Sequence, residues 1–140
     1  MTEALTTTLA NDLSEIDRLI AEVEAFGARL GLPARLVQQT VLALDELVTN
    51  LVSYGYEPEA RGRIAIRLAV EGDRLTAEIV DDARPFDPLA VPPPDTMRPL
   101  EDRPVGGLGI HLARSVMDSV RYERRRGRNR LMLTKRIVRQ

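Results

Sequence analysis

The sequence of 140 residues has no cysteine and no tryptophan, and its one histidine is His111. Without cysteine the chain can form no disulfide, offer no thiol nucleophile and bind no metal through sulfur, which fits a reducing cytoplasm. A zinc site built from several histidines is excluded as well. Aromatic residues make up 4% of the chain, which is too few for a surface on which nucleic-acid bases stack.

A strong net charge and a long apolar run are also missing. The formal net charge is −1, so no overall field directs the protein toward nucleic acid or an anionic membrane. No apolar stretch is long enough to span a bilayer, and residues 1–10 carry no signal-peptide pattern. We therefore expect a cytoplasmic protein with no membrane contact and no direct nucleic-acid contact. Its length and 44% hydrophobic content predict a single domain over residues 1–140.

The first third of the chain has the pattern of one short strand and two helices. Residues 4–9 are compatible with a strand, and Asp12 with Glu15 has the spacing of a helix-capping box. Apolar residues then recur at helical spacing until Gly31, which should end the first helix. The second helix is predicted over residues 33–54. Its apolar stripe, which should face a sheet, comprises Val37, Val41, Leu44, Val48, Leu51 and Val52.

The same helix has a second row of side chains on its other side, at about 100° per residue. This row comprises Gln39, Ala43, Glu46 and Asn50. Glu46 and Asn50 are one turn apart and project together. A carboxamide oxygen suits Mg²⁺, and a neighbouring carboxylate can act as a general base. Taken alone, such a pair is more often a solvated polar helix face.

The middle of the chain predicts a β-hairpin that ends on an aspartate. Residues 64–70 alternate as a strand with one buried face, residues 71–74 form the turn, and the returning strand ends at Asp81. Asp81 continues the inward-facing series, so its carboxylate should lie at the edge of the core and require a donor. The exocyclic amine of adenine is such a donor, but turn aspartates are also common at the ends of strands.

Residues 82–107 hold seven of the nine prolines and cannot form regular structure. A loop of this length in a compact domain is usually functional or disordered. Two arginines in it, Arg98 and Arg103, could neutralise the terminal phosphate of a nucleotide. The glycines at its end precede a further helix, whose free N–H groups suit a phosphate. These glycines are Gly106, Gly107 and Gly109.

The remaining residues predict a closing hairpin with its turn near Gly127. Its arginines indicate either a solvated turn or an acidic partner, and His111 has the pattern of a solvated residue. The predicted order is strand, two helices, two strands, long loop, helix and two strands. This order is typical of an α+β two-layer sandwich, with a mixed but mostly antiparallel sheet and three helices on one face.

Four segments, in this order and spacing, resemble the anti-sigma-factor serine kinases of bacteria, which belong to the Bergerat-fold ATPases shared with histidine kinases. Residues 43–56 resemble the N box of that family, and residues 80–88 its first glycine box. Residues 105–110 resemble the second glycine box, and residues 126–131 the closing hairpin turn. The resemblance covers nearly the whole chain.

The resemblance implies that ATP and Mg²⁺ are cofactors and assigns roles to matching residues. Asn50 would hold Mg²⁺, Glu46 would be the general base, Asp81 would bind the adenine amine, and Arg103 would reach the γ-phosphate from an ATP-lid loop at residues 82–107. The further nucleotide contacts implied are Ala83, Gly106, Gly107, Leu108, Gly109 and Asn129. Implied partners are a STAS anti-anti-sigma protein, phosphorylated on serine, and a sequestered sigma factor, with a possible homodimer.

Two positions depart from the family pattern. Ala83 stands in place of a glycine, and Tyr54 in place of a frequent histidine. If residue 83 needed a positive φ, alanine would cost about 1 kcal/mol and add a methyl group beside the adenine. Two alternatives to a kinase therefore stay open. One is a non-catalytic nucleotide-binding regulator with weakened ATP affinity, and the other is a sensor-kinase-like module without its second domain.

Overall fold

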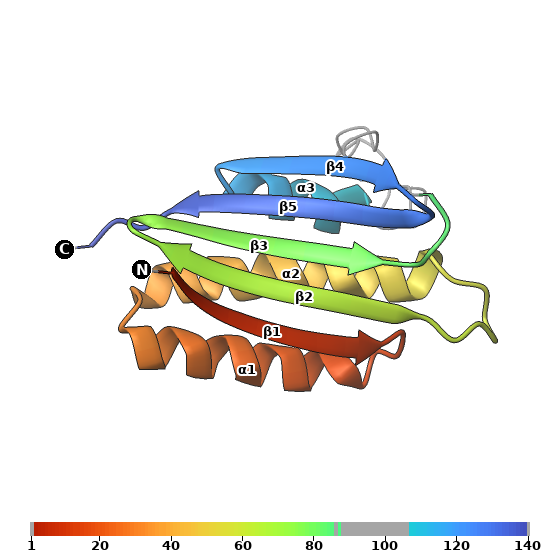
Figure 1. Cartoon of the computed structure of the whole chain (residues 1–140), viewed down its shortest axis with the longest axis horizontal. Coiled ribbons are helices and arrows are strands. Elements are labelled where there is room, and N and C mark those ends of the chain that lie inside the picture. The colour runs from red at the N-terminus through yellow and green to blue at the C-terminus, as the bar shows by residue number, and fades with distance from the viewer. Residues whose placement is uncertain (1, 86, 88–106, 140) are drawn as a thin grey trace.

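The computed structural model describes residues 2–85, 87 and 107–139, and it confirms the predicted order of elements (Figure 1). Most of the predicted lid, residues 88–106 with Arg98, Arg103 and Gly106, lies outside the described residues. The elements are β1 (Thr2–Ala10), α1 (Glu15–Leu30), α2 (Ala34–Tyr54), β2 (Arg63–Glu71), β3 (Arg74–Asp81), α3 (Gly107–Val116), β4 (Ser119–Arg125) and β5 (Arg128–Arg136).

The five strands form one sheet in the order β1-β2-β3-β5-β4, and every pairing within it is antiparallel. The three helices lie along one face of this sheet, with α2 between α1 and α3 (Figure 1). This is the α+β two-layer sandwich that the sequence predicts, although the sheet is antiparallel throughout rather than mixed. Strands β1, β2 and β3 are neighbours in the sheet, and their long, regular pairing fixes the register of the central strands.

The core fills the space between the sheet and the helices. Alternate residues of the strands point into it, and the largest fully buried side chains among them are Leu9, Ile64, Ile66, Leu68, Leu75, Ile79 and Leu133. On α2 the buried arc differs from the predicted stripe, because Leu36, Leu47 and Ala43 are buried while Val37, Val41 and Val52 are partly exposed. A helix with neighbours on both sides buries a wider arc than one that only lies on a sheet.

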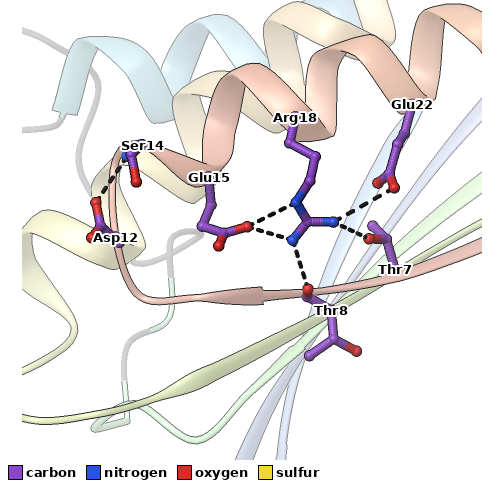
Figure 2. Close-up of polar contacts among 7 residues, drawn as sticks. All are labelled: Thr7, Thr8, Asp12, Ser14, Glu15, Arg18 and Glu22. Carbon is purple, nitrogen blue, oxygen red and sulfur yellow. Dashed lines mark hydrogen bonds and ion pairs between the residues drawn. The ribbon is translucent and has the colours of Figure 1, made fainter.

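Helix α1 is tied to the edge strand β1 by Arg18, and the predicted capping box does not form. Arg18 donates to the hydroxyl of Thr7 at 3.0 Å and the carbonyl of Thr8 at 2.9 Å, and pairs with Glu15 and Glu22 (Figure 2). Because Glu15 is engaged by Arg18, it does not reach back to residue 12. The carboxylate of Asp12 instead accepts from the backbone N–H of Ser14 at 2.9 Å.

The two N-terminal helices are separated where the sequence predicts. Gly31 ends α1 with a φ of 64°, a left-handed conformation in which glycine has no side-chain clash. Pro33 stands at the N-cap of α2, where the missing proline N–H costs no hydrogen bond. No helix in the described part of the chain is long and apolar enough to cross a membrane.

Candidate functional site

Four elements meet at one end of the sheet. Strand β3 ends there at Asp81, which pairs with Asn129 near the start of β5, and the C-terminal half of α2 lies behind it (Figure 1). Two residues separate the end of α3 from β4, which begins at the far end of the sheet, and the 10 residues of α3 span about 15 Å. The first turn of α3 therefore points back toward the end that carries Asp81.

Asp81 is buried, with 5% of its surface exposed, and its hydrogen bonds leave one oxygen available. Its Oδ1 accepts from the backbone N–H of Ala83 at 3.0 Å and from the side-chain amide of Asn129 at 2.8 Å. Among the described residues, Oδ2 has no partner. Desolvation raises the pKa of Asp81, and the two hydrogen bonds act in the opposite direction. Oδ2 is therefore an available acceptor on a buried residue, suited to a ligand N–H donor.

Asn129 fixes the turn that follows Asp81. It is 4% exposed, and its Nδ2 donates to Asp81 and, at 2.9 Å, to the carbonyl of Arg84. Its Oδ1 accepts from the hydroxyl of Tyr122 at 2.5 Å, so both ends of the carboxamide are engaged. The cross-strand pairing of Asp81 with Asn129 thus connects the closing hairpin to the candidate ligand-binding carboxylate.

Ala83 is accommodated without backbone strain. Among the described residues that are not glycine, only Arg126 has a positive φ, so the penalty considered for alanine at this position does not arise. Ala83 is 3% exposed, and its methyl group packs against Gly55, where an added Cβ would lie 3.1 Å from it. Its carbonyl accepts from Arg124 at 2.9 Å. The space left by glycine at position 55 therefore receives the methyl group at position 83.

Asp82 has the opposite environment to its neighbour. Its carboxylate is exposed and accepts from the backbone N–H of Arg63 at 3.0 Å and from the hydroxyl of Tyr56 at 2.8 Å. Slight desolvation raises the pKa of Asp82, but these hydrogen bonds outweigh it and the net pKa is lowered. The Tyr56 ring also covers Gly62, where an added Cβ would lie 2.1 Å from a ring carbon. Asp82 thus anchors the backbone beside the site.

Asn50 is held by its own helix in a way that orients its oxygen. Its Nδ2 donates to the carbonyl of Glu46 at 2.8 Å, and the residue is 6% exposed. Only the amide nitrogen can donate to a carbonyl, so Oδ1 is the atom left without a partner among the described residues. The Glu46 side chain is partly exposed and has no hydrogen bond or ion pair there.

The polar row of α2 is therefore not the solvated face that its residue types alone favour. Asn50 is buried, and Ala43 is fully buried. A buried carboxamide with an unused oxygen is costly in a helix that serves packing alone. The C-terminal part of the row, with Asn50 buried and Glu46 partly exposed, is therefore a candidate for ligand binding.

The remaining predicted nucleotide contacts lie at the start of α3. Gly107, Leu108 and Gly109 belong to the first turn of this helix, whose leading N–H groups have no intrahelical acceptor. An anion is favoured at such a position by the N–H groups and by the helix dipole together. The other two predicted residues, Gly106 and Arg103, lie outside the described residues.

The family assignment follows from comparison with known proteins. The family described as "Histidine kinase-like ATPase domain" matches residues 9–135. The chain belongs to this family. The serine/threonine-protein kinase BtrW of Bordetella bronchiseptica is 34% identical over 101 residues, which are 72% of this chain and 71% of BtrW. A serine-protein kinase RsbW of Bacillus cereus is 32% identical over 116 residues, 80% of this chain and 71% of that kinase.

Within the family the chain is thus a member of the RsbW-like, anti-sigma-factor group of serine kinases. A crystal structure titled as the RsbU and RsbW domains of Rv1364c from Mycobacterium tuberculosis has the same fold. The TM-score is 0.72 over 99% of this chain, at 20% sequence identity, and the chain spans 33% of the length of that one. Membership of an ATPase family implies that this domain binds ATP.

The described residues fit a magnesium nucleotide better than a metal held by protein alone. No group of three or more His, Cys, Asp or Glu side chains gathers to hold a metal in residues 2–85, 87 and 107–139. Mg²⁺ commonly takes few protein ligands and completes its shell with water and phosphate oxygens. One carboxamide oxygen at Asn50 meets that requirement. The unused oxygen of Asp81 meets the requirement of an adenine amine.

Several residues that shape the site have no signal in the sequence. Tyr122 and Arg124 reach it from β4, whose register against β5 cannot be read from its irregular pattern of arginines. Gly55 and Tyr56 support the site by contacting the turn at residues 82–84. For Gly55 there is a partial signal in the Gly-Tyr pair that closes the N box, because a glycine just past a helix end can mark a close approach of two backbones.

Proposed function

We propose that this protein is an ATP-dependent serine kinase that phosphorylates a STAS anti-anti-sigma protein and sequesters a sigma factor. The observation that carries this proposal is the set of unused acceptors on buried residues at one end of the sheet. Asp81 Oδ2 is at the end of β3 and Asn50 Oδ1 is in the C-terminal half of α2. The Arg84 N–H donates to the Gly55 carbonyl at 3.2 Å and joins these two ends, and α3 packs against α2. The names of the relatives BtrW and RsbW support the kinase activity.

The roles of the residues follow from their environments. Asp81 accepts the adenine amine through Oδ2, and Asn129 and the Ala83 N–H hold its other oxygen. Asn50 contributes the protein ligand to Mg²⁺, which when bound neutralises charge on the phosphates. Gly107, Leu108 and Gly109 present backbone N–H groups to the phosphates, with Gly106 beside them.

Glu46 accepts the proton of the attacking serine hydroxyl, because its carboxylate has no competing partner and lies one helical turn from the magnesium ligand. Arg103 stabilises the terminal phosphate from a lid at residues 82–107. We expect residues 1–140 to act as one ATPase domain in the cytoplasm, with no direct contact to nucleic acid or membrane, and a homodimer is possible.

The second candidate is a nucleotide-binding regulator without phosphotransfer, which Ala83 at the glycine position suggests. Its physical basis is weaker in this structure, because the Ala83 methyl group packs on Gly55 and its backbone is unstrained. The third candidate, a sensor-kinase-like module, would bind ATP but would have no STAS or sigma partner.

One experiment distinguishes these functions. The protein is incubated with Mg-ATP and the STAS protein encoded beside it, and serine phosphorylation is followed by mass spectrometry. We expect transfer by the wild type and its loss in Asn50→Ala and in Glu46→Ala. Glu59→Gln is the matched control, because Glu59 is exposed and has no partner in the described structure. Tight nucleotide binding without transfer would contradict the kinase and support the regulator.

A further inference from the structure

A groove of about 890 Å³ lies at the end of the molecule opposite to the candidate nucleotide site. The first turn of α2 forms one wall, and the end of β5 with the residues after it forms the other. Figure 1 shows these two segments at the same end, beside the C-terminus. Asn129 and Arg136 are seven residues apart on β5, so the groove is about 23 Å from Asp81. It is therefore a separate site.

Four cationic side chains line this groove. They are Arg35, Lys135, Arg136 and Arg139, and we name the groove that they line the basic groove. Its lining contains no carboxylate among the described residues. For a chain with a net charge of −1, this is a strongly uneven distribution of charge.

The cations differ in how far they are neutralised. Lys135 lies 3.6 Å from Asp118, and Arg136 lies 3.7 Å from Asp73. Among the described residues, Arg139 donates only to the carbonyl of Gly31, at 3.4 Å, and Arg35 has no partner. Four cations face two carboxylates, which leaves an excess of two positive charges. The two uncompensated cations lie on opposite walls of the basic groove.

Apolar surface lies between the charges. Val138 is 65% exposed, which is the largest exposure among the big apolar side chains described, and it lines the basic groove with Pro33. The floor includes Leu36, which is 4% exposed. The first turn of α2 adds the N–H groups of a helix start with no acidic residue and no side-chain cap.

We propose that the basic groove binds an acidic segment of a partner protein, in which carboxylate side chains flank apolar ones. Charge complementarity selects the acidic side chains, and Val138 with Pro33 selects an apolar neighbour. The groove is far larger than a single phosphate ion, and its cations stand on separate walls, so one small anion cannot reach them all. No aromatic residue is among the described residues that line it, so they offer a nucleic acid no stacking surface.

The test uses the full chain and a fluorescein-labelled peptide of eight residues, Glu-Glu-Leu-Glu-Glu-Leu-Glu-Glu, with fluorescence anisotropy at low salt. A Gln-for-Glu version of the peptide is the first control. We expect the Glu peptide to bind at least about tenfold more tightly, because several exposed charge pairs contribute together. We expect amide NMR shifts at residues 34–37 and 135–139, and none at residues 46–50.

A pair of double variants isolates the position of the charge. Arg35→Gln with Arg139→Gln should lower the affinity for the Glu peptide about tenfold. Arg61→Gln with Arg114→Gln removes the same charge from exposed arginines elsewhere, which have no partners in the described structure, and should weaken it less than twofold. All four side chains are exposed, so both variants should fold, and their unfolding temperatures check this.

Three results would overturn the proposal. The first is equal weakening of Glu-peptide binding in the two double variants, and the second is equal binding of the Gln and Glu peptides. The third is displacement of the Glu peptide from the same amides by pyrophosphate, or by a short DNA duplex, at a lower concentration than the unlabelled Glu peptide needs. The nucleotide site takes no part in these measurements, so failure of the proposed kinase function would leave this inference standing, and the reverse also holds.

Discussion

The two ends of helix α2 differ in the kind of polar group that they present. At the C-terminal half, Asn50 is nearly fully buried, as is Asp81 at the end of β3, and hydrogen bonds hold each in one orientation. At the N-terminal end, Arg35 and Arg139 are exposed on long side chains with few partners. Buried and fixed acceptors suit one small ligand of defined shape, whereas exposed cations suit an extended and variable partner.

The largest expected effect is that of Asp81→Asn on nucleotide binding. The new Oδ1 would still accept from Ala83 and Asn129, but the amide would present a donor where the adenine amine needs an acceptor. Affinity for ADP should fall at least about tenfold, measured by calorimetry, because hydrogen bonds to charged groups contribute about 1.5–3 kcal/mol. Binding that survives unchanged would place the adenine elsewhere.

The same variant should lose affinity for ADP without losing folding stability. The pKa of Asp81 is raised in the fold, so the native state binds its proton more tightly than the unfolded chain does. The free energy of unfolding therefore falls as pH rises from the unfolded value of 3.8 through the raised pKa, and then levels. Asp81→Asn should remove that decrease, and at pH 7 its unfolding midpoint in urea should be no lower than that of the wild type. A marked loss of stability at pH 7 would contradict this account.

Asn129→Ala should affect both stability and binding, because this residue joins the closing hairpin to the turn after Asp81. The change leaves Asp81 with one donor fewer and the Tyr122 hydroxyl without its acceptor. We expect a loss of about 1–3 kcal/mol in the free energy of unfolding by urea, with weaker ADP binding. Loss of stability with full ADP affinity would show that the closing hairpin does not contribute to nucleotide binding.

Ala83→Gly should have a modest effect, and it tests the departure from the family glycine. Restoring glycine removes a buried methyl group and makes the unfolded chain more flexible, so stability should fall by about 1 kcal/mol. ADP affinity should change less than about threefold, because the methyl group packs on Gly55. A large gain in affinity would instead support a regulator weakened by its alanine.

The smallest expected effect is that of Arg35→Gln with Arg139→Gln on nucleotide binding. These residues lie at the far end of α2, about 22 Å from Asn50 by helical rise. ADP affinity should change less than twofold in calorimetry. A larger change would show that the two ends are coupled, and the comparison drawn between them would then fail.

Much of this architecture could be predicted because its signals are local. Alternation in β2 and β3, the turn between them and the helix end at Gly31 depend on residues close in sequence, and they fixed the inward position of Asp81. The capping box failed because Glu15 pairs with Arg18 one turn along α1, and Arg18 is itself held by contacts with Thr7 and Thr8 of β1 that local spacing cannot reveal.

The supporting residues of the site could not be predicted for the same reason. Tyr122 and Arg124 reach the turn at residues 82–84 across the sheet, and the burial of Ala43 and Asn50 depends on the packing of three helices. The space for the Ala83 methyl group depends on Gly55, which is 28 positions away in sequence and in contact only in the fold.

The central claim is that Asp81, Asn50 and the start of α3 bind one magnesium nucleotide together. Calorimetric titration of ADP with and without Mg²⁺ tests it directly in the wild type, in Asn50→Ala and in Asp81→Asn. The account predicts that Mg²⁺ tightens ADP binding in the wild type, that Asn50→Ala loses this magnesium effect but keeps ADP binding, and that Asp81→Asn weakens ADP binding at least about tenfold with or without Mg²⁺. A magnesium effect that persists unchanged in Asn50→Ala, or no heat at all in the wild type, would contradict it.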